Sequence, residues 1–163
     1  MPTPDFVLAL RAKVGNDPLW LPGVCAVVLR PLAEPTEVLL VRRSDDGTWT
    51  PVKGIMDPGE EVGQAAIREC LEETGVQIEV DRLVNVGIIG PVHYDNGDVT
   101  TYLEHTVRAS WVAGEPCVGD DESIDAGWFP LEDLPGPIPP ADLAQIEVAV
   151  TNPRDVVLGG LPR

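Results

Sequence analysis

The stretch from Gly54 to Val76, GIMDPGEEVGQAAIRECLEETGV, decides how this chain is interpreted. Its first part contains Pro58 and Gly59, which do not suit a helix interior, so we expect a looped entry. The second part, from about Val62 to Thr74, has helical spacing of apolar and charged residues and predicts one amphipathic helix.

The predicted helix gathers its acids on one side. Successive side chains of a helix lie about 100° apart, so Glu72 and Glu73 fall within about 60° of Glu69. The other side carries apolar and small residues, namely Ile67, Cys70, Leu71 and Thr74. We therefore expect one face of the helix to pack and the acidic face to carry chemistry.

Three neighbouring acids on one helix repel one another. Like charges at these spacings destabilise a helix by a few tenths of a kcal/mol per pair, so they call for a compensating positive charge. A divalent cation supplies it, and carboxylate oxygens suit Mg²⁺ or Mn²⁺. The alternative is a solvated acidic surface, the usual meaning of a charge run. The regular spacing favours a metal site.

The spacing of this stretch resembles the Nudix box, the signature of the Nudix hydrolases. The pattern is Gly, five residues, Glu, seven residues, then Arg-Glu-apolar-x-Glu-Glu-x-Gly. Its fixed positions are filled here by Gly54, Glu60, Arg68, Glu69, Glu72, Glu73 and Gly75. Cys70 stands where the family more often has Ile, Leu or Val, and a buried thiol behaves as a small hydrophobe. The resemblance extends loosely from about Val24 to Leu134.

The resemblance implies an α/β fold, a Nudix-like α/β/α sandwich with a central mixed sheet. It also implies metal-dependent attack of water on a phosphorus of a nucleoside diphosphate that is linked to another group. By position, the metal ligands are Glu69, Glu72, Glu73 and the backbone carbonyl of Lys53. Glu69 and Glu72 are candidate catalytic residues within the helix.

In several Nudix subfamilies the catalytic base comes from a later loop, where this chain has Asp120, Asp121 and Glu122. Glu122 is the best candidate of the three, although a solvated acidic turn is the alternative for each. We expect Glu60 and Arg68 to form a structural ion pair that fixes the loop against the helix, with contact to the metal shell as the alternative.

The two glycines of the box are expected where the backbone conformation or a close contact excludes a side chain. Gly54 indicates a close approach at the metal and Gly75 a helix C-cap. Positive charge for phosphates comes from Arg42, Arg43 and Lys53. Trp49 either stacks on a base or sugar, or packs in the core.

Pro91 stands sixteen residues after the last glycine of the box, as in many ADP-ribose pyrophosphatases of the family. The alternative is a proline that only ends a strand. ADP-ribose or a related nucleotide sugar is the leading substrate hypothesis, followed by nucleoside triphosphates, including oxidised ones, and dinucleoside polyphosphates. Two other classes are a nucleotide-sensing module without catalysis and a diphosphate isomerase, which would need a catalytic cysteine.

Length and composition set the remaining expectations. A chain of 163 residues with 44% hydrophobic residues suits a single domain, with a core at about 20–150, a short N-terminal helix and a C-terminal tail. The net charge of −16 opposes binding to nucleic-acid polymers and anionic membranes. Three cysteines without a CxxC pair, and no leader-like N-terminus, predict a cytoplasmic protein. Family analogy favours a homodimer.

Other elements follow from periodicity and turn residues. Helices are expected at 5–14 and 141–150. The Asn96-Gly97 pair predicts a turn. Strands are expected at 24–29, 37–43, 76–80, 83–89, 99–112 and 125–129, with a loop at 44–51.

Overall fold

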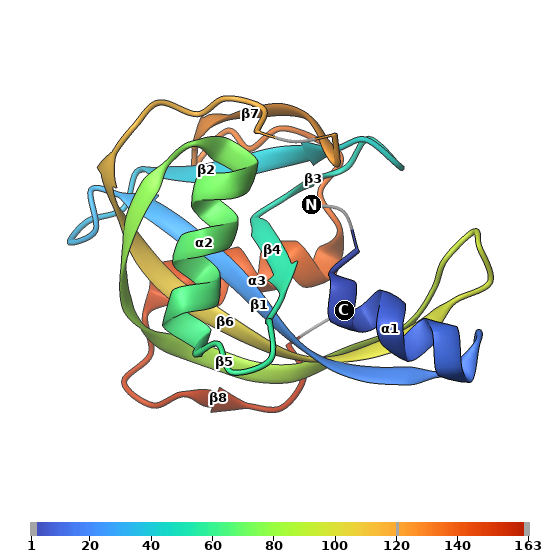
Figure 1. Cartoon of the computed structure of the whole chain (residues 1–163). Helices are drawn as coiled ribbons and strands as arrows, with labels where there is room; N and C mark the ends of the chain where they lie inside the picture. The colour runs from blue at the N-terminus through green and yellow to red at the C-terminus, as the bar shows by residue number, and fades with distance from the viewer. Residues whose placement is uncertain (1–2, 120, 162–163) are drawn as a thin grey trace.

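The computed structural model describes residues 3–119 and 121–161, and within them three helices accompany an eight-stranded sheet (Figure 1). The helices are α1 (Asp5–Val14), α2 (Val62–Thr74) and α3 (Pro140–Thr151). The strands are β1 (Leu19–Arg30), β2 (Glu37–Arg43), β3 (Trp49–Thr50), β4 (Val52–Ile55), β5 (Gln77–His93), β6 (Val99–Ala113), β7 (Ser123–Pro130) and β8 (Val157–Leu158).

The sheet is mixed. Its main path runs β3-β2-β1-β6-β5-β8, while β4 pairs with β1 and β7 pairs with β2. The pairs β1–β6 and β5–β8 are parallel, and the others are antiparallel. Strand β4 lies antiparallel to the middle of β1, with Val24 opposite Gly54 and Cys25 opposite Lys53. This pairing fixes the start of the Gly54–Val76 stretch in the sheet.

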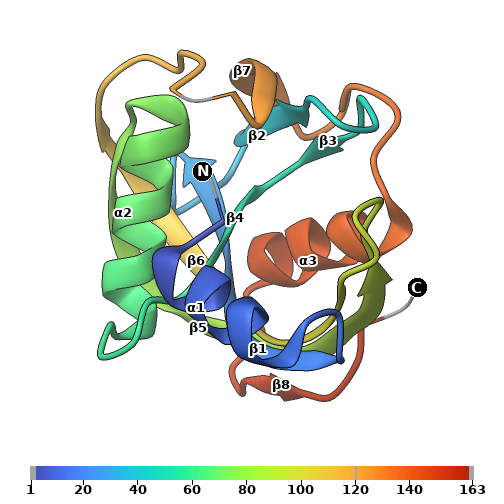
Figure 2. The same cartoon turned by 45° about the vertical axis from the view of Figure 1, so that its right-hand side comes forward.

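Two helices cover the two faces of the sheet, α2 on one and α3 on the other (Figures 1 and 2). Beneath α2, residues such as Val24, Val52 and Ala66 form one buried apolar cluster. Beneath α3, residues such as Val27 and Ile146 form the second. The prediction of an α/β/α sandwich on a mixed sheet is therefore confirmed.

The observed bounds of several helices and strands agree closely with those predicted from the sequence. The helix at 5–14 and the strand at 37–43 are as predicted, and the helix expected at 141–150 is one residue longer at each end. The strands expected at 76–80 and 83–89 are one bulged strand, β5. A two-residue strand, β3, interrupts the loop expected at 44–51.

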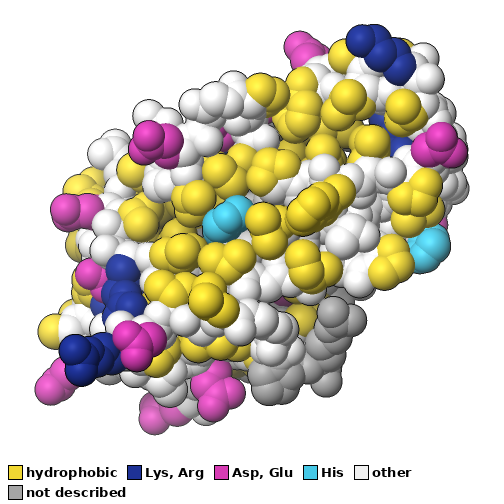
Figure 3. All heavy atoms as spheres, turned by 90° about the horizontal axis from the view of Figure 1, so that it is seen from below, with side chains coloured by type: hydrophobic (Ala, Val, Ile, Leu, Met, Phe, Trp, Pro, Cys, Tyr) yellow, Lys and Arg dark blue, Asp and Glu magenta, His cyan; other side chains and the backbone are white. Residues whose placement is uncertain are grey.

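An apolar surface remains uncovered where β1, β5 and β8 run past the end of α2. Trp20, Ile88 and Leu158 are 69%, 41% and 82% exposed. Seen from below, hydrophobic side chains spread over this side of the molecule (Figure 3). In the part of the chain that the structure describes, no helix is long and apolar enough to cross a membrane.

Arg108 on β6 ties α3 to the sheet, and the sequence alone did not single it out. The residue is 5% exposed. Its guanidinium donates to the carbonyl of Ala149 at 2.9 Å, to Asp81 at 2.7 Å and to the carbonyl of Leu32. One side chain thus joins the end of α3, the loop after β1 and strand β5.

We expect Arg108→Met to lower the free energy of unfolding by about 3 kcal/mol, because Asp81 and two carbonyls lose their donor. Urea denaturation followed by circular dichroism measures the change. Lys13→Met, at an exposed position of α1, is the control and should stay within about 0.5 kcal/mol of the parent chain. Equal stability of the two variants would contradict this role for Arg108.

Candidate active site

Hydrogen bonds of capping residues fix both ends of helix α2. The Glu61 side chain accepts from the backbone of Gln64, whose own side chain accepts from the Glu61 backbone, so the two form a capping box. Gly75 closes the helix in the left-handed conformation, with φ of 69°, and its N–H donates to the Leu71 carbonyl at 3.0 Å. The expected C-cap at Gly75 is present.

The faces of α2 differ from the prediction. Ile67 and Leu71 are 43% and 50% exposed, whereas Glu69 and Glu73 are 1% and 5% exposed. The helix packs through small residues, Ala65, Ala66 and Cys70, all fully buried. The expectation that Ile67 and Leu71 pack inward was wrong, because these small side chains bring the helix axis close to the sheet and two of the acids inward with it.

Glu69 lies directly over Gly54. A Cβ added at Gly54 would lie 1.9 Å from both the Glu69 Cδ and its Oε1, so only glycine leaves this space for the carboxylate. Oε1 accepts from Arg68 at 2.8 Å, while Oε2 is buried without a hydrogen-bond partner in the described ranges. Burial raises the pKa of Glu69 to about 7, although the Arg68 charge opposes the shift.

Arg68 connects the looped entry to the helix. Its guanidinium forms a bidentate ion pair with Glu60, with N···O distances of 2.8 and 2.7 Å. It also donates to the Ile55 carbonyl at 3.2 Å and to Glu72 at 3.3 Å. The hydrogen bonds from Arg68 lower the pKa of Glu60. The structure therefore contains the ion pair expected between Glu60 and Arg68.

Glu72 stands apart from the other two acids of the helix. Its side chain is 46% exposed and is turned toward Arg68. No group of three His, Cys, Asp or Glu side chains that could hold a metal occurs among residues 3–119 and 121–161. The helix acids thus do not converge as a complete ligand set.

The loop after β6 packs on the end of α2. The Cys117 N–H donates to the Thr74 carbonyl at 3.0 Å, and the Gly119 N–H donates to the Glu73 carbonyl at 2.8 Å. A Cβ at Gly119 would lie 1.9 Å from the carbonyl oxygen of Glu72, so this close approach also needs glycine. Sequence reasoning missed Gly119, whose position close before the acidic loop was the available signal.

This loop leads Glu122 to a pocket beside α2. The pocket is lined by Val41, Arg43, Thr50, Lys53, Glu73, Glu122 and Ser123. Of the other two acids expected in the loop, Asp121 is exposed and does not line the pocket, and Asp120 lies outside the described residues. The structure thus brings Glu122 together with Glu73 and Lys53.

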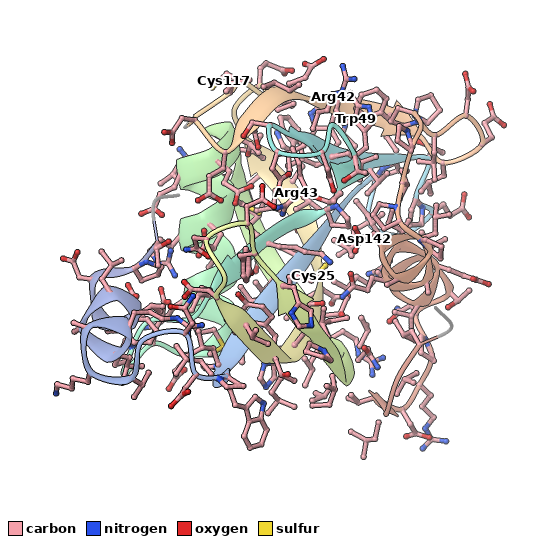
Figure 4. All side chains as sticks on the ribbon, turned by 90° about the vertical axis from the view of Figure 1, so that its right-hand side faces the viewer. Cys25, Arg42, Arg43, Trp49, Cys117 and Asp142 are labelled. Atoms are coloured by element: carbon pink, nitrogen blue, oxygen red, sulfur yellow. The ribbon has the colours of Figure 1, made fainter. Side chains whose placement is uncertain are left out.

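The two arginines of β2 are successive residues at a bulge in the pairing with β7, and their side chains have different surroundings. Arg43 lines the pocket and is held by Asp45 through two hydrogen bonds, one of 2.9 Å. Arg42 is exposed and donates to the Gly47 carbonyl at 3.1 Å. Figure 4 shows Arg43 toward α2, with Arg42 and Trp49 farther from that helix. The substrate-binding role expected of Arg42 finds no support in this pocket.

Trp49 and Pro91 also lie outside the pocket. Trp49 is 7% exposed and its ring meets Phe129 edge-to-face, with centroids 4.7 Å apart. Of the two roles considered for Trp49, the structure favours packing over substrate stacking. Pro91 is an exposed residue in an irregular part of β5 and does not line this pocket.

Lys53 points its side chain away from α2. Its ammonium pairs with Asp142 of α3 and lies 3.8 Å from Glu104 of β6. Burial disfavours the charge, but the two carboxylates outweigh burial and raise the pKa of Lys53. The side chain is therefore a charged link between β4 and α3, and only its backbone lies beside Gly54. Sequence reasoning missed Asp142 and Glu104.

The site fits a divalent cation in two respects. Glu69 Oε2 is a buried carboxylate oxygen without a donor, which is costly unless a proton or a cation meets it. The backbone of Gly54 lies directly against the same carboxylate, beside its Oε1. Carboxylate and carbonyl oxygens are the ligands that Mg²⁺ and Mn²⁺ prefer.

A known protein family matches most of this chain. The sequence model of the NUDIX domain matches residues 20–149. The NAD-capped RNA hydrolase NudC of Pasteurella multocida is 33% identical over 122 residues, which cover 70% of this chain and 42% of that protein. The 8-oxo-dGDP phosphatase NUDT18 of Homo sapiens is 33% identical over 128 residues, covering 76% of this chain and 38% of that protein. The chain thus spans about two fifths of these relatives.

Solved structures give the same result. A MutT NUDIX hydrolase from Burkholderia pseudomallei superposes with a TM-score of 0.58 at 29% identity, covering 80% of this chain and 97% of that one. An ADP-ribose pyrophosphatase from Streptococcus suis superposes with a TM-score of 0.61 at 20% identity, covering 85% and 97%, and shows the likeness of fold alone. With its complete box, its sandwich fold and a domain match over most of its length, this chain belongs to the Nudix hydrolase family.

Proposed function

We propose that this chain hydrolyses a pyrophosphate bond in a nucleoside diphosphate linked to another group, with Mg²⁺ or Mn²⁺ as cofactor. One observation carries the proposal: the Glu69 carboxylate is buried against Gly54 and keeps one oxygen without a donor in the described part of the chain. A purely structural acid at this depth would have both oxygens satisfied. A buried carboxylate oxygen left without a donor suits a cation.

Glu69, Glu73 and the carbonyl of Lys53 would hold the metal, with Glu72 joining them by a change of rotamer. When bound, the metal would supply Lewis-acid stabilisation of phosphate charge and a lower pKa for water. Arg68 holds Oε1 of Glu69 at 2.8 Å, which leaves Oε2 for the cation. The ion pair with Glu60 keeps Arg68 in that place.

The pocket beside α2 supplies the remaining roles. Glu122, just before β7, lines it with Glu73 and is proposed to accept the proton of the attacking water. Glu69 and Glu72 are the other candidates for this base. Arg43 is proposed to bind a phosphate by exchanging its Asp45 partner for the substrate. An arginine is suited to this exchange, because phosphate and carboxylate present similar paired oxygens.

ADP-ribose or a related nucleotide sugar is the leading substrate, and nucleoside triphosphates, including oxidised ones, are the second candidate. The sequence position of Pro91, sixteen residues after Gly75, supports the first, and the name of a relative, an 8-oxo-dGDP phosphatase, supports oxidised nucleotides. NAD-capped RNA, named for NudC, is a third candidate, which the net charge of −16 disfavours. A nucleotide-sensing module would not need the box acids.

A small nucleotide is thus the proposed partner. The homodimer and the cytoplasmic location expected from the sequence stay predictions.

The proposal is tested by incubating the chain with ADP-ribose, nucleotide sugars, nucleoside triphosphates and NAD in the presence of Mg²⁺ or Mn²⁺, and identifying the products by chromatography and mass spectrometry. We expect a nucleoside monophosphate and a phosphorylated second product, and no turnover once EDTA removes the metal. Binding of a nucleotide without turnover of any compound would instead support the sensing module.

Glu69→Gln should reduce turnover at least about a hundredfold, because it removes the charge that faces the proposed metal while keeping the size of the side chain. Product release at saturating substrate measures the effect. Glu79→Gln, on the exposed side of β5, is the matched control and should keep full activity. Turnover of Glu69→Gln within twofold of the parent chain would contradict the assignment of Glu69 as a metal ligand.

Gly54→Ala should separate activity from stability. The added Cβ displaces the Glu69 carboxylate, which can swing away at little cost, so we expect a loss of turnover of about a hundredfold with a change in unfolding free energy below about 1 kcal/mol. Gly63→Ala is the control, because its Cβ meets nothing within 4 Å. Kinetics and urea denaturation of both variants give the comparison, and full activity of Gly54→Ala would contradict the role of this contact.

A further inference from the structure

Strand β4 lies at the proposed metal site and has few bonds of its own. It pairs with β1 at four positions, and β1 is the only strand with which it pairs in the described part of the chain. The Met56 N–H donates to the Pro22 carbonyl at 3.2 Å, a bond that flanks a non-hydrogen-bonded pair in an antiparallel ladder. The two kinds of pair alternate, so the pair of Lys53 with Cys25, two positions farther, is also non-hydrogen-bonded. The carbonyl of Lys53 therefore points away from β1.

The side chain of Lys53 holds β4 from the other face of the sheet. Its ammonium pairs with Asp142 of α3 and lies 3.8 Å from Glu104. The side chain of Asp142 is only 6% exposed. Asp142 and Cys25, the β1 partner of Lys53, lie on the α3 side of the sheet (Figure 4). A hydrogen bond between two charged groups is directional, so it fixes the point of α3 at which the lysine is held.

Helix α3 is fixed to the sheet independently of β4. The buried amide of Gln145 donates to two side chains of β6, those of Glu104 and Thr106. Arg108, also on β6, donates to a backbone carbonyl near the end of the helix. Asp142 therefore stands on an element that does not depend on β4 for its place, and it can act as a fixed point for that strand.

We propose that Asp142 is a positioning residue for metal binding, because by holding the Lys53 ammonium it keeps the Lys53 carbonyl at the metal site. That carbonyl is bonded to Gly54, whose backbone lies against the Glu69 carboxylate. Desolvation offsets much of the attraction within a buried ion pair, so the pair sets a position more than it adds stability. The proposal rests on the proposed function, since it concerns the metal that the hydrolase would use.

Binding of Mn²⁺ to the full chain without nucleotide tests the inference, measured from the electron paramagnetic resonance signal of the free ion. Glu69→Gln identifies the binding that belongs to this site, because other carboxylates of a chain with a net charge of −16 also attract the ion. The decisive variant is Lys53→Met/Asp142→Asn, which removes the ion pair and leaves the net charge unchanged. We expect it to bind Mn²⁺ at least about tenfold more weakly, the usual effect of removing a group that orients a metal ligand.

Lys53→Met alone separates position from charge. Removal of an ammonium near the site would strengthen cation binding if charge alone mattered, whereas release of β4 weakens it, and we expect binding about tenfold weaker. Arg30→Met/Glu37→Gln is the matched control, because it removes an ion pair with an N···O distance of 2.7 Å at the far end of β1 and also keeps the net charge. Circular dichroism and urea denaturation verify that each variant folds.

The control should bind Mn²⁺ within about twofold of the parent chain, and a loss as large as that of Lys53→Met/Asp142→Asn would overturn the inference. Unchanged affinity of Lys53→Met/Asp142→Asn overturns it too, whether or not the chain hydrolyses a nucleotide. Should this variant not fold, Asp142→Asn decides in the same way, since Lys53 then keeps Glu104 as its partner.

The two proposals fail separately. Weaker Mn²⁺ binding by these variants of a chain that cleaves nothing in the panel supports the positioning role and overturns the hydrolysis. Hydrolysis by a chain whose Mn²⁺ affinity does not respond to the loss of the ion pair overturns the positioning role alone. Absence of any Mn²⁺ binding that depends on Glu69 overturns the metal site and this inference together.

Discussion

The missing side chain at Gly54 is the constraint on which the rest of the site depends. Because nothing projects from this residue, the carboxyl group of Glu69 can lie almost completely buried against the backbone of β4. That burial in turn requires Arg68 to satisfy one oxygen, and Arg68 requires Glu60 to hold it. The looped entry, the helix and the strand are therefore fixed as one unit, and a change at any of the three positions reaches the other two.

Strand alternation explains how one dipeptide serves both faces of the sheet. Gly54 lies under α2, while the side chain of its neighbour Lys53 crosses to α3 and meets Asp142 and Glu104. Strand β4 is short and pairs with β1 at only four positions. Two residues that are neighbours in sequence thus contribute to opposite faces of the sheet.

Local signals predicted much of this molecule. Caps and spacing gave the bounds of α2, the ion pair of Glu60 with Arg68 and the cap at Gly75, because each joins residues a few turns apart. The inward face of α2 was mispredicted, since helical spacing cannot tell that Ala65 and Ala66 bring the helix closer to the sheet than Ile67 does. The position of Trp49 depends on Phe129, eighty residues away, and no sequence pattern links them.

The cluster around Gln145 was beyond prediction for the same reason. Its members come from β4, β6 and α3, and each is an ordinary polar residue in its own segment. Only the tertiary fold places two acids beside Lys53 and an amide beside one of those acids. The sequence can indicate which chemistry a box performs, whereas a cluster of this kind joins residues that meet only in the folded chain.

The parallel pairing of β1 with β6 has a consequence for how the chain acquires its structure. Each of its eleven registered pairs, from Leu19 with Thr100 to Leu29 with Ser110, joins residues about 80 positions apart. Such contacts have a high loop-closure entropy and form slowly. During synthesis, β1 can acquire this partner only after β6 has left the ribosome. Until then the β5–β6 hairpin is unavailable as a template, and a nascent chain with an already complete box would still lack the central pairing of its sheet.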